Sequence, residues 1–272
     1  MPEAVFTDLG DGRFAASKLA RGPWDANAQH GGAPAALLMR ALERLPGEPG
    51  LQIARVTYEL LRPVPLGELT VEADVTRPGR RVRLLEGLIQ APDGTDLVRA
   101  TALQVQGADR SSGDPDPPPP GPEQGRPHEP GGAGFAPPYS PMFTPDAIEI
   151  RFVSGVFGHG PATAWFRMRV PLVASEEPSP LERFAAVGDF GNGISAVLDW
   201  NEYVFINPDL TLYVDRPPQG EWICLDARTI IPPGGVGIAE STIYDERGRV
   251  GRAVQALLVA PRPAGATSAG RP

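Results

Sequence analysis

The sequence predicts an α+β protein of two similar modules, each with one helix packed against an antiparallel sheet. The main observation is an internal repeat: the second half matches the first at a constant offset of 154 positions, so Thr57 falls on Thr211 and Arg62 on Arg216. A repeat of this length indicates a duplicated domain rather than a solenoid of short units. Two further observations agree with it. Turn signals divide strand-like segments in both halves, and each half contains one apolar, helix-favouring run.

The first module, residues 1–107, is predicted from its amino terminus onward as strand, loop, helix and four further strands. The run from Ala33 to Leu45 combines strong helix formers with apolar residues on every face, which is typical of a buried helix. Pro78-Gly79 and Pro92-Asp93-Gly94 are hairpin turn signals, so the strands should be antiparallel. The expected strands are 13–19, 51–62, 68–77, 81–91 and 96–106.

The segment 108–146 is rich in Pro and Gly, with four consecutive prolines from Pro117 to Pro120. It has too few apolar residues to offset the entropy of ordering, so we expect an extended, disordered linker with an exposed His128. The second module, residues 147–262, should contain one long helix from about 181 to 198. Its expected strands are 147–156, 162–171, 203–215, 221–232, 235–245 and 249–260, and a disordered tail should follow at 263–272.

Composition excludes several classes of function. The net charge of −8, without a basic run, argues against nucleic acid as a partner. The single cysteine, Cys224, lies in an apolar run and is expected to be a buried thiol, which excludes a disulfide framework. No apolar stretch is long enough to span a membrane, and the first residues do not resemble a signal peptide, so we expect a cytoplasmic protein.

Three polar residues lie in otherwise apolar elements. Asp189 interrupts the second helix, where a buried carboxylate would have a raised pKa; the alternative is a residue that caps the turn or faces solvent. Gln255 interrupts an apolar strand near the end of the chain. Thr211 is the weakest of the three, because threonine is common in strands and its counterpart Thr57 suggests a structural role.

The loop His30-Gly31-Gly32 precedes the first helix. Glycines there permit a close approach of the backbone, and free N–H groups at a helix start can hold an oxyanion; a purely steric need is the alternative. His159 has no Cys or His partner nearby in the sequence, which argues against a metal site. Nucleophile-elbow, Walker and GxGxxG motifs are absent, so we expect neither a nucleotide nor a redox cofactor.

These features together resemble the double hotdog acyl-CoA thioesterases, specifically the acyl-CoA thioesterase II-like group. The resemblance covers about residues 22–261 apart from the linker, and its most specific parts are HGG and AALLMRAL in the first half, with Gly188-Asp189-Phe190 in the second. It implies a double hotdog fold, with a long central helix wrapped by sheet in each module. Family members are similar in carrying an Asp on the second helix, a Ser or Thr on the following strand and a Gln on the last strand. These positions map to Asp189, Thr211 and Gln255.

The resemblance implies an acyl-CoA thioesterase without a cofactor, and most simply a homodimer. We expect Asp189 to activate water, Thr211 and Gln255 to hold that water, and the N–H groups near Gly31 or Gly32 to bind the oxyanion. Two alternatives stay open. One is a non-catalytic acyl-CoA or lipid-binding protein. The other is a hotdog hydratase or dehydratase, which is less favoured because such chemistry uses a His beside the Asp and no His lies near Asp189 in the sequence.

Overall fold

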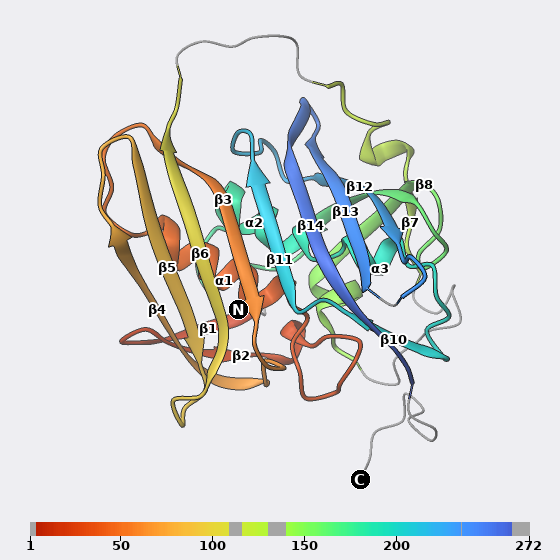
Figure 1. Cartoon of the computed structure of the whole chain (residues 1–272), viewed down its shortest axis with the longest axis horizontal. Helices are drawn as coiled ribbons and strands as arrows, with labels where there is room; N and C mark the ends of the chain where they lie inside the picture. Colours follow the sequence, from red (N-terminus) through yellow and green to blue (C-terminus); the bar gives the residue numbers. More distant parts are fainter. Residues whose placement is uncertain (1–3, 109–115, 130–139, 235, 263–272) are drawn as a thin grey trace.

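The strands of both halves join into one antiparallel sheet, which faces the viewer in Figure 1. The structure is a computed structural model, and it describes residues 4–108, 116–129, 140–234 and 236–262. The strand order in the described sheet is β1-β2-β4-β5-β6-β3-β11-β14-β13-β12-β9-β8-β7, and β10 pairs with β14 beside this path. The predicted antiparallel hairpins β4–β5 and β5–β6 are confirmed.

The elements of the first half lie close to the predicted ranges. They are β1 (Phe6–Gly10), β2 (Arg13–Ala16), the short helix η1 (Lys18–Ala20), α1 (Gly32–Glu43), β3 (Leu51–Leu60), β4 (Gly67–Arg77), β5 (Val82–Gln90) and β6 (Asp96–Gln106). Strand β1 was not predicted. It pairs with β2 and meets Val173 of the second half, so it is held by contacts distant in sequence.

Among the described residues, the second half adds three strands before the helices α2 and α3 and five after them. Its elements are η2 (Pro122–Gln124), β7 (Arg126–Pro127), η3 (Phe143–Ala147), β8 (Ile148–Ser154), β9 (Ala162–Met168), α2 (Pro180–Gly188), α3 (Gly191–Ile194), β10 (Tyr203–Ile206), β11 (Asp209–Val214), β12 (Ile223–Ile230), β13 (Val236–Asp245) and β14 (Gly248–Pro261). One hydrophobic core includes buried residues of both halves, among them Leu37 of α1 and Phe184 of α2.

The two halves meet where β3 pairs with β11. In this pairing Thr57 lies opposite Thr211, its own counterpart in the repeat. An antiparallel pair in which a residue faces its own equivalent has a local two-fold relation at that point. The repeat seen in the sequence is therefore also a structural relation between β3 and β11.

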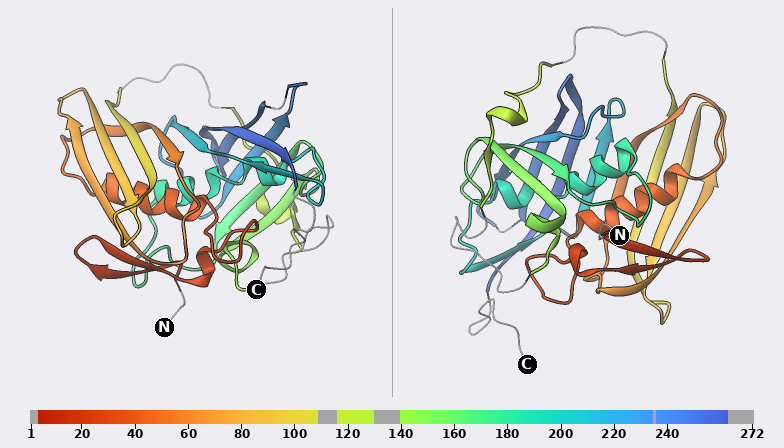
Figure 2. Two further views of the ribbon diagram at one scale, coloured as in Figure 1. Left: turned by 60° about the horizontal axis from the view of Figure 1, so that its bottom comes forward. Right: turned by 180° about the vertical axis from the view of Figure 1, so that it is seen from behind.

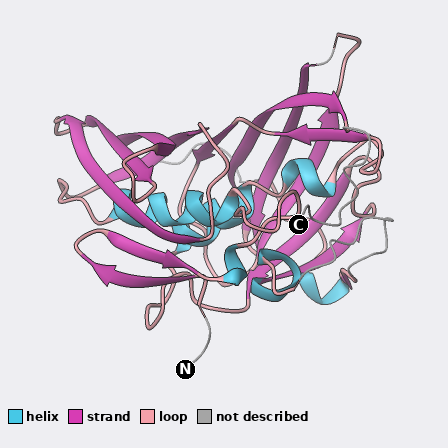
Figure 3. Ribbon diagram, turned by 90° about the horizontal axis from the view of Figure 1, so that it is seen from below, coloured by secondary structure: helices cyan, strands magenta, loops and turns pink. Residues whose placement is uncertain are grey.

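The helices pack on the inner face of the curved sheet, as the view from behind and the view from below show (Figures 2 and 3). Helix α1 packs against β4, β5 and β6, and also against α2. The expectation of one long helix from 181 to 198 is wrong, because α2 ends at Gly188 and a separate short helix α3 begins at Gly191. Asp189 lies at this break, so its side chain is not part of a regular helix surface.

The strand predicted over 203–215 is also divided. Tyr203–Ile206 pairs with the end of β14, and Asp209–Val214 pairs with both β14 and β3. The break falls at Asn207-Pro208, where proline has no N–H to continue the ladder. The interruption frees the Asn207 side chain to turn toward Asp189.

The prediction of an extended, disordered linker over 108–146 is corrected for the residues of that segment that the structure describes. Strand β7 pairs with β8, and the Trp165 indole donates a hydrogen bond to the Pro120 carbonyl at 2.7 Å. The predicted exposure of His128 is wrong too, since its ring stacks on Phe157 at 4.8 Å between centroids. Proline carbonyls and an imidazole thus find partners on the second half. The predicted tail 263–272 lies outside the described residues.

Candidate active site

Asp189 follows the last residue of α2 and faces the start of α1. The two helices run antiparallel, so the carboxyl end of α2 lies beside the amino end of α1, and a Cβ atom added to Gly31 would lie 2.7 Å from Asp189 Oδ2. Only 8% of Asp189 is exposed. The carboxylate is therefore held between the two halves, where glycine alone leaves it enough room.

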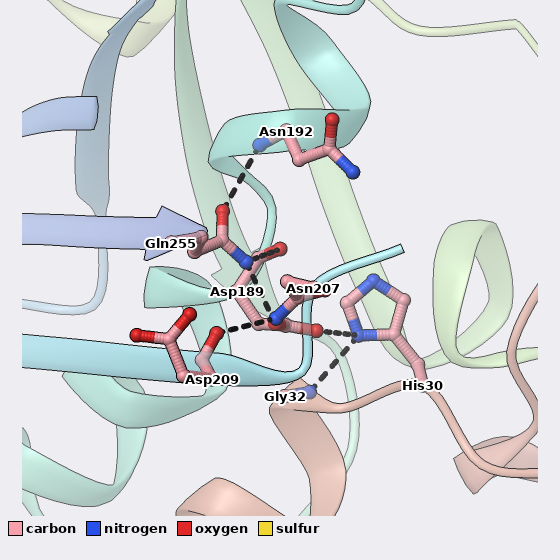
Figure 4. A network of polar contacts seen from close by, with 7 residues as sticks. All are labelled: His30, Gly32, Asp189, Asn192, Asn207, Asp209 and Gln255. Atoms are coloured by element: carbon pink, nitrogen blue, oxygen red, sulfur yellow. Dashed lines mark hydrogen bonds and ion pairs between the residues drawn. The ribbon is translucent and has the colours of Figure 1, made fainter. Parts of the chain in front are cut away.

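One carboxylate oxygen of Asp189 accepts two hydrogen bonds from amide side chains (Figure 4). Oδ1 lies 2.9 Å from Gln255 Nε2 and 2.8 Å from Asn207 Nδ2. Gln255 is oriented by its own oxygen, which accepts a hydrogen bond from the Asn192 N–H at 3.1 Å. Because both donors point at Oδ1, this oxygen is fixed in place and Oδ2 is the more available of the two.

The second oxygen, Oδ2, faces the first half of the chain. His30 Nδ1 lies 3.2 Å from it, and the Gly32 N–H points both to the Asp189 carboxylate and to His30 Nδ1, which is 3.1 Å from the Gly32 nitrogen. The imidazole is held by stacking on Phe190, with 4.4 Å between centroids. In Figure 4 the other ring nitrogen of His30 makes none of the contacts drawn.

Burial changes the acid–base properties of both groups. It raises the pKa of Asp189 to about 7, against the opposing effect of hydrogen bonds from Asn207, Gly32 and Gln255. Burial lowers the pKa of His30 to about 3, so the imidazole is neutral at pH 7. The contact between them is thus a hydrogen bond and not an ion pair. A carboxyl with a pKa near 7 is suited to accept and return a proton at neutral pH.

A cavity of about 620 Å³ opens beside this cluster, and Asp189, His30, Gly31 and Asn207 are among the residues that line it. Most of the remaining wall is apolar or aromatic. It includes Trp24, Leu61, Met142, Phe157, Phe190, Trp200, Ile206 and Leu258. A reactive carboxylate at the wall of a largely apolar cavity is the usual arrangement of a small-molecule site.

The structure brings together five of the six residues predicted for the site: Asp189, Gln255, His30, Gly31 and Gly32. Thr211 is a correction. Its hydroxyl donates to Thr57 Oγ1 at 3.2 Å on the seam between the halves.

Strand alternation explains why Thr211 lies apart from the site. Leu210 and Leu212 are buried toward the helices, and a Cβ atom on Gly188 would touch the Leu212 side chain. Thr211 therefore points to the opposite face of the sheet from Asp189.

Sequence reasoning missed two groups of the site. Asn207 donates to Asp189 Oδ1, a contact that was not expected of any residue, and the available signal was the Asn-Pro pair inside a predicted strand. The His30 imidazole was overlooked because only the backbone of its loop was considered. The statement that no His lies near Asp189 is wrong in space, although 159 positions separate the two residues.

Within the described residues there is no group of three or more His, Cys, Asp or Glu side chains able to hold a metal ion. The same residues contain no helix that is both long enough and apolar enough to cross a membrane.

Two family models match the chain in sequence. Residues 20–105 match the N-terminal domain of acyl-CoA thioesterase, and residues 113–259 match its C-terminal domain. The chain belongs to the acyl-CoA thioesterase family. As a member of this family it is a thioester hydrolase. No match was found among curated proteins.

Solved structures agree with this family in their fold. A conserved protein with the hot dog fold from Alicyclobacillus acidocaldarius is 16% identical with a TM-score of 0.71, over 94% of this chain and 95% of the other. The acyl-CoA thioesterase II of Mycobacterium marinum is 16% identical with a TM-score of 0.65, over 96% of each chain. The tesB protein of Mycobacterium avium subsp. paratuberculosis is also 16% identical, with a TM-score of 0.65 over 94% and 96%. The chain thus has the hotdog fold.

Proposed function

We propose that this thioesterase hydrolyses an acyl-CoA thioester with a water molecule that Asp189 activates. The observation that carries the proposal is a buried carboxylate with a pKa of about 7 at the wall of an apolar cavity, fixed on one side by Gln255 and Asn207. Its other oxygen, Oδ2, faces His30 and the start of α1. A general base of this kind contributes about 10²–10⁴-fold to a rate.

In the proposed reaction Oδ2 of Asp189 takes a proton from water while the water oxygen forms a bond to the thioester carbonyl carbon. The carbonyl oxygen becomes an oxyanion, and the C–S bond then breaks. The proton returns from Asp189 to the leaving sulfur, which gives a free acid and a thiol. Gln255 and Asn207 act by holding Oδ1, so that Oδ2 keeps its direction through both proton transfers.

The start of α1 supplies the partner for the oxyanion. Among the described residues the Gly31 N–H makes no hydrogen bond, whereas the Gly32 N–H is engaged with His30 and Asp189. An unpaired N–H at the amino end of a twelve-residue helix is a suitable donor for developing negative charge. The carboxylate comes from one half and the N–H from the other.

His30 holds the proton that Asp189 takes from water in this proposal. Nδ1 of the neutral imidazole carries no proton, because it accepts the Gly32 N–H, and the hydroxyl of protonated Asp189 donates to the same nitrogen. The imidazole stays neutral in both states, consistent with its lowered pKa. His30 thereby keeps the proton of Asp189 within the site between the two transfers.

The same pair makes hydration of an α,β-unsaturated thioester a second candidate. That reaction was disfavoured on the sequence because it lacked a His near Asp189, and the 3.2 Å contact removes this objection. A carboxylate–imidazole pair beside an N–H donor suits the addition of water to an activated double bond. Family membership favours hydrolysis.

One experiment separates these reactions. Purified protein is given saturated and α,β-unsaturated acyl-CoA thioesters, and released thiol and loss of the conjugated double bond are followed in parallel. Thiol release that disappears in Asp189→Asn supports the proposal. Loss of the double bond without thiol release would favour hydration. Binding of acyl-CoA without either reaction would leave the non-catalytic binding protein.

We further propose that two chains pair as a homodimer. The outer face of the second half carries exposed apolar side chains on neighbouring strands: Ile230 faces Ile238, and Val236 faces Leu258 in the sheet register. Val236 is 65% exposed and Leu258 59%. Light scattering tests the pairing, because Val236→Lys should shift a dimer toward monomers, whereas a wild-type monomer at high concentration would refute it.

A further inference from the structure

Four aromatic rings form a continuous stack along one wall of the cavity. His128 and Phe157 stack with 4.8 Å between centroids and 21° between planes, and Phe157 and Trp200 with 5.8 Å and 21°. Trp200 continues onto Trp24 at 4.9 Å and 24°. All four residues line the cavity, although they come from four separate segments of the chain.

The two inner rings of this stack present their edges to any ligand. Phe157 stacks with both His128 and Trp200, and Trp200 stacks with both Phe157 and Trp24. A ring with two stacking neighbours has its faces largely taken up by protein. Since both rings line the cavity, a molecule inside it contacts their C–H edges.

Packing behind the stack holds these rings in position. The buried Phe205 meets Trp24 edge-on at 5.3 Å and 89°, and it meets Trp200 at 4.6 Å and 65°. A Cβ atom on Gly158 would lie 2.7 Å from the Trp200 indole nitrogen, so the turn after Phe157 also fits tightly against this ring. The wall is thus a fixed surface of ring edges rather than a set of adjustable side chains.

Ring edges carry partial positive charge and ring faces partial negative charge, so an aromatic ligand gains by placing its face against such a wall. This edge-to-face contact adds about 0.5–1.5 kcal/mol beyond the burial of apolar area. A saturated chain or ring in the same place is stabilised only by the burial of its apolar area. We infer that the cavity selects an acyl group that carries an aromatic ring, which makes arylalkanoyl thioesters the preferred substrate class.

The distance from Asp189 to the wall limits the spacer between carbonyl and ring. Asp189 precedes the short helix α3, and a Cβ atom on Gly193 of that helix would be 3.8 Å from the tip of the Phe157 ring. Four residues of helix rise by about 6 Å, which corresponds to a spacer of a few carbon atoms. Phenylpropionyl-CoA is accordingly the probe of choice.

The decisive comparison uses 3-phenylpropionyl-CoA and 3-cyclohexylpropionyl-CoA, which have the same number of carbon atoms and nearly the same shape. Hydrophobic burial alone favours the cyclohexyl compound, because it is the more apolar. The structure predicts a kcat/KM for the phenyl compound that is higher by about 3–10-fold, as expected for edge-to-face contacts. An equal or higher value for the cyclohexyl compound would overturn the inference.

Phe157→Leu provides the matched variant, because it removes one inner ring and keeps an apolar side chain. It should bring the phenyl-to-cyclohexyl ratio close to one. Leu61→Ala, which changes the apolar wall outside the stack, should alter both substrates by the same factor and leave the ratio at the wild-type value. Because the readout is a ratio on one protein, a partial loss of folded enzyme does not affect it.

This inference rests on the proposed thioesterase reaction, and calorimetry keeps the two separable. Asp189→Asn protein should bind the phenyl compound without hydrolysing it. Its dissociation constant for that compound should be about 3–10-fold lower than for the cyclohexyl compound. If wild-type protein bound the phenyl compound preferentially but did not hydrolyse it, the proposed reaction would be refuted and the preference for arylalkanoyl groups would be supported. Hydrolysis without the preference would do the opposite.

Discussion

The two ends of the α1–α2 helix pair have the same construction but different contents. At one end Asp189, after α2, faces Gly31 at the start of α1. At the other end Glu43, the last residue of α1, accepts a hydrogen bond from Ser179, which precedes α2. Both carboxyl groups have a pKa raised by burial. The cavity is lined by Asp189 and Gly31, and neither Glu43 nor Ser179 is part of its wall.

The difference lies in the residue that faces the carboxylate. Ser179 fills its end: its hydroxyl donates to Glu43 and accepts from the Glu182 N–H, as in a normal helix cap. Gly31 has no side chain, so it leaves room beside Asp189 and an N–H that can bind substrate. A buried carboxylate is therefore not sufficient for a site. The opposing helix start must also be left uncapped.

The largest expected effect is the loss of the carboxylate at one end compared with the other. Asp189→Asn should lower kcat by about 10²–10⁴-fold, because an amide accepts no proton from water. Glu43→Gln should leave kcat at the wild-type value, since its partner Ser179 tolerates an amide oxygen. Thiol release measured on both variants checks the contrast, with circular dichroism as the control for folding. Equal losses would mean that the ends do not differ in function.

The second test replaces, one at a time, the residues that face the two carboxylates by alanine. Gly31→Ala places a methyl group 2.7 Å from the original position of Asp189 Oδ2, so the carboxylate must move. A displacement of about 1 Å at a catalytic group costs about 10²-fold in rate.

Ser179→Ala is its matched control. It removes a helix cap worth about 1 kcal/mol of stability and should not change kcat. Steady-state kinetics and thermal unfolding on both variants separate the two effects. A wild-type rate in Gly31→Ala would show that the site tolerates a side chain there.

Most of the fold, but only part of the site, could be predicted from the sequence. Hairpin signals predicted the antiparallel strands of the first half, because they depend on local pattern, whereas the pairing of Thr57 with Thr211 at the seam was not predicted. The break of the second helix at Asp189 was missed because tertiary contacts decide it, whereas the division of a strand at Asn207 had a local signal in Asn207-Pro208 that was not used. The pairing of His30 with Asp189 joins distant segments and has no local signal at all.

The third prediction concerns pH, which should act on the two ends in different ways. Asp189 must be ionised to accept a proton, so kcat/KM should rise with pH and reach half its maximum at about pH 7. Below that value it should fall about tenfold for each pH unit. A pH–rate profile of the free enzyme checks this. A midpoint near 4 would mean that the catalytic carboxyl is a solvated one.

At the other end of the helix pair, pH should change the stability of the folded protein instead of the rate. Burial raises the pKa of Glu182 to about 7, above its unfolded value, so its contribution to stability is present below about pH 4.5 and is lost as pH rises through about 7. Glu182→Gln removes that loss. Its Tm should match the wild type at pH 4 and exceed it at pH 8 by about 2–4 °C for each kcal/mol recovered. A lower Tm at both values would contradict the raised pKa.

The smallest expected effect is that of Thr211→Val, and it decides whether the seam takes part in the reaction. The Thr211 hydroxyl bonds to its own counterpart Thr57 on the face of the sheet away from Asp189, so kcat and KM should stay at wild-type values. Stability should fall by about 0.5–1.5 kcal/mol, because the Thr57 hydroxyl loses its partner.

Replacing both threonines by valine should recover part of that stability, since no hydroxyl is then left unpaired. Asn207→Ala provides the contrasting control. It removes a hydrogen bond to Asp189 Oδ1 and should lower kcat while leaving the seam intact. If Thr211→Val lowered kcat and Asn207→Ala did not, the strand residue would belong to the reaction after all. In that case the assignment of the site to the break between β10 and β11 would be wrong.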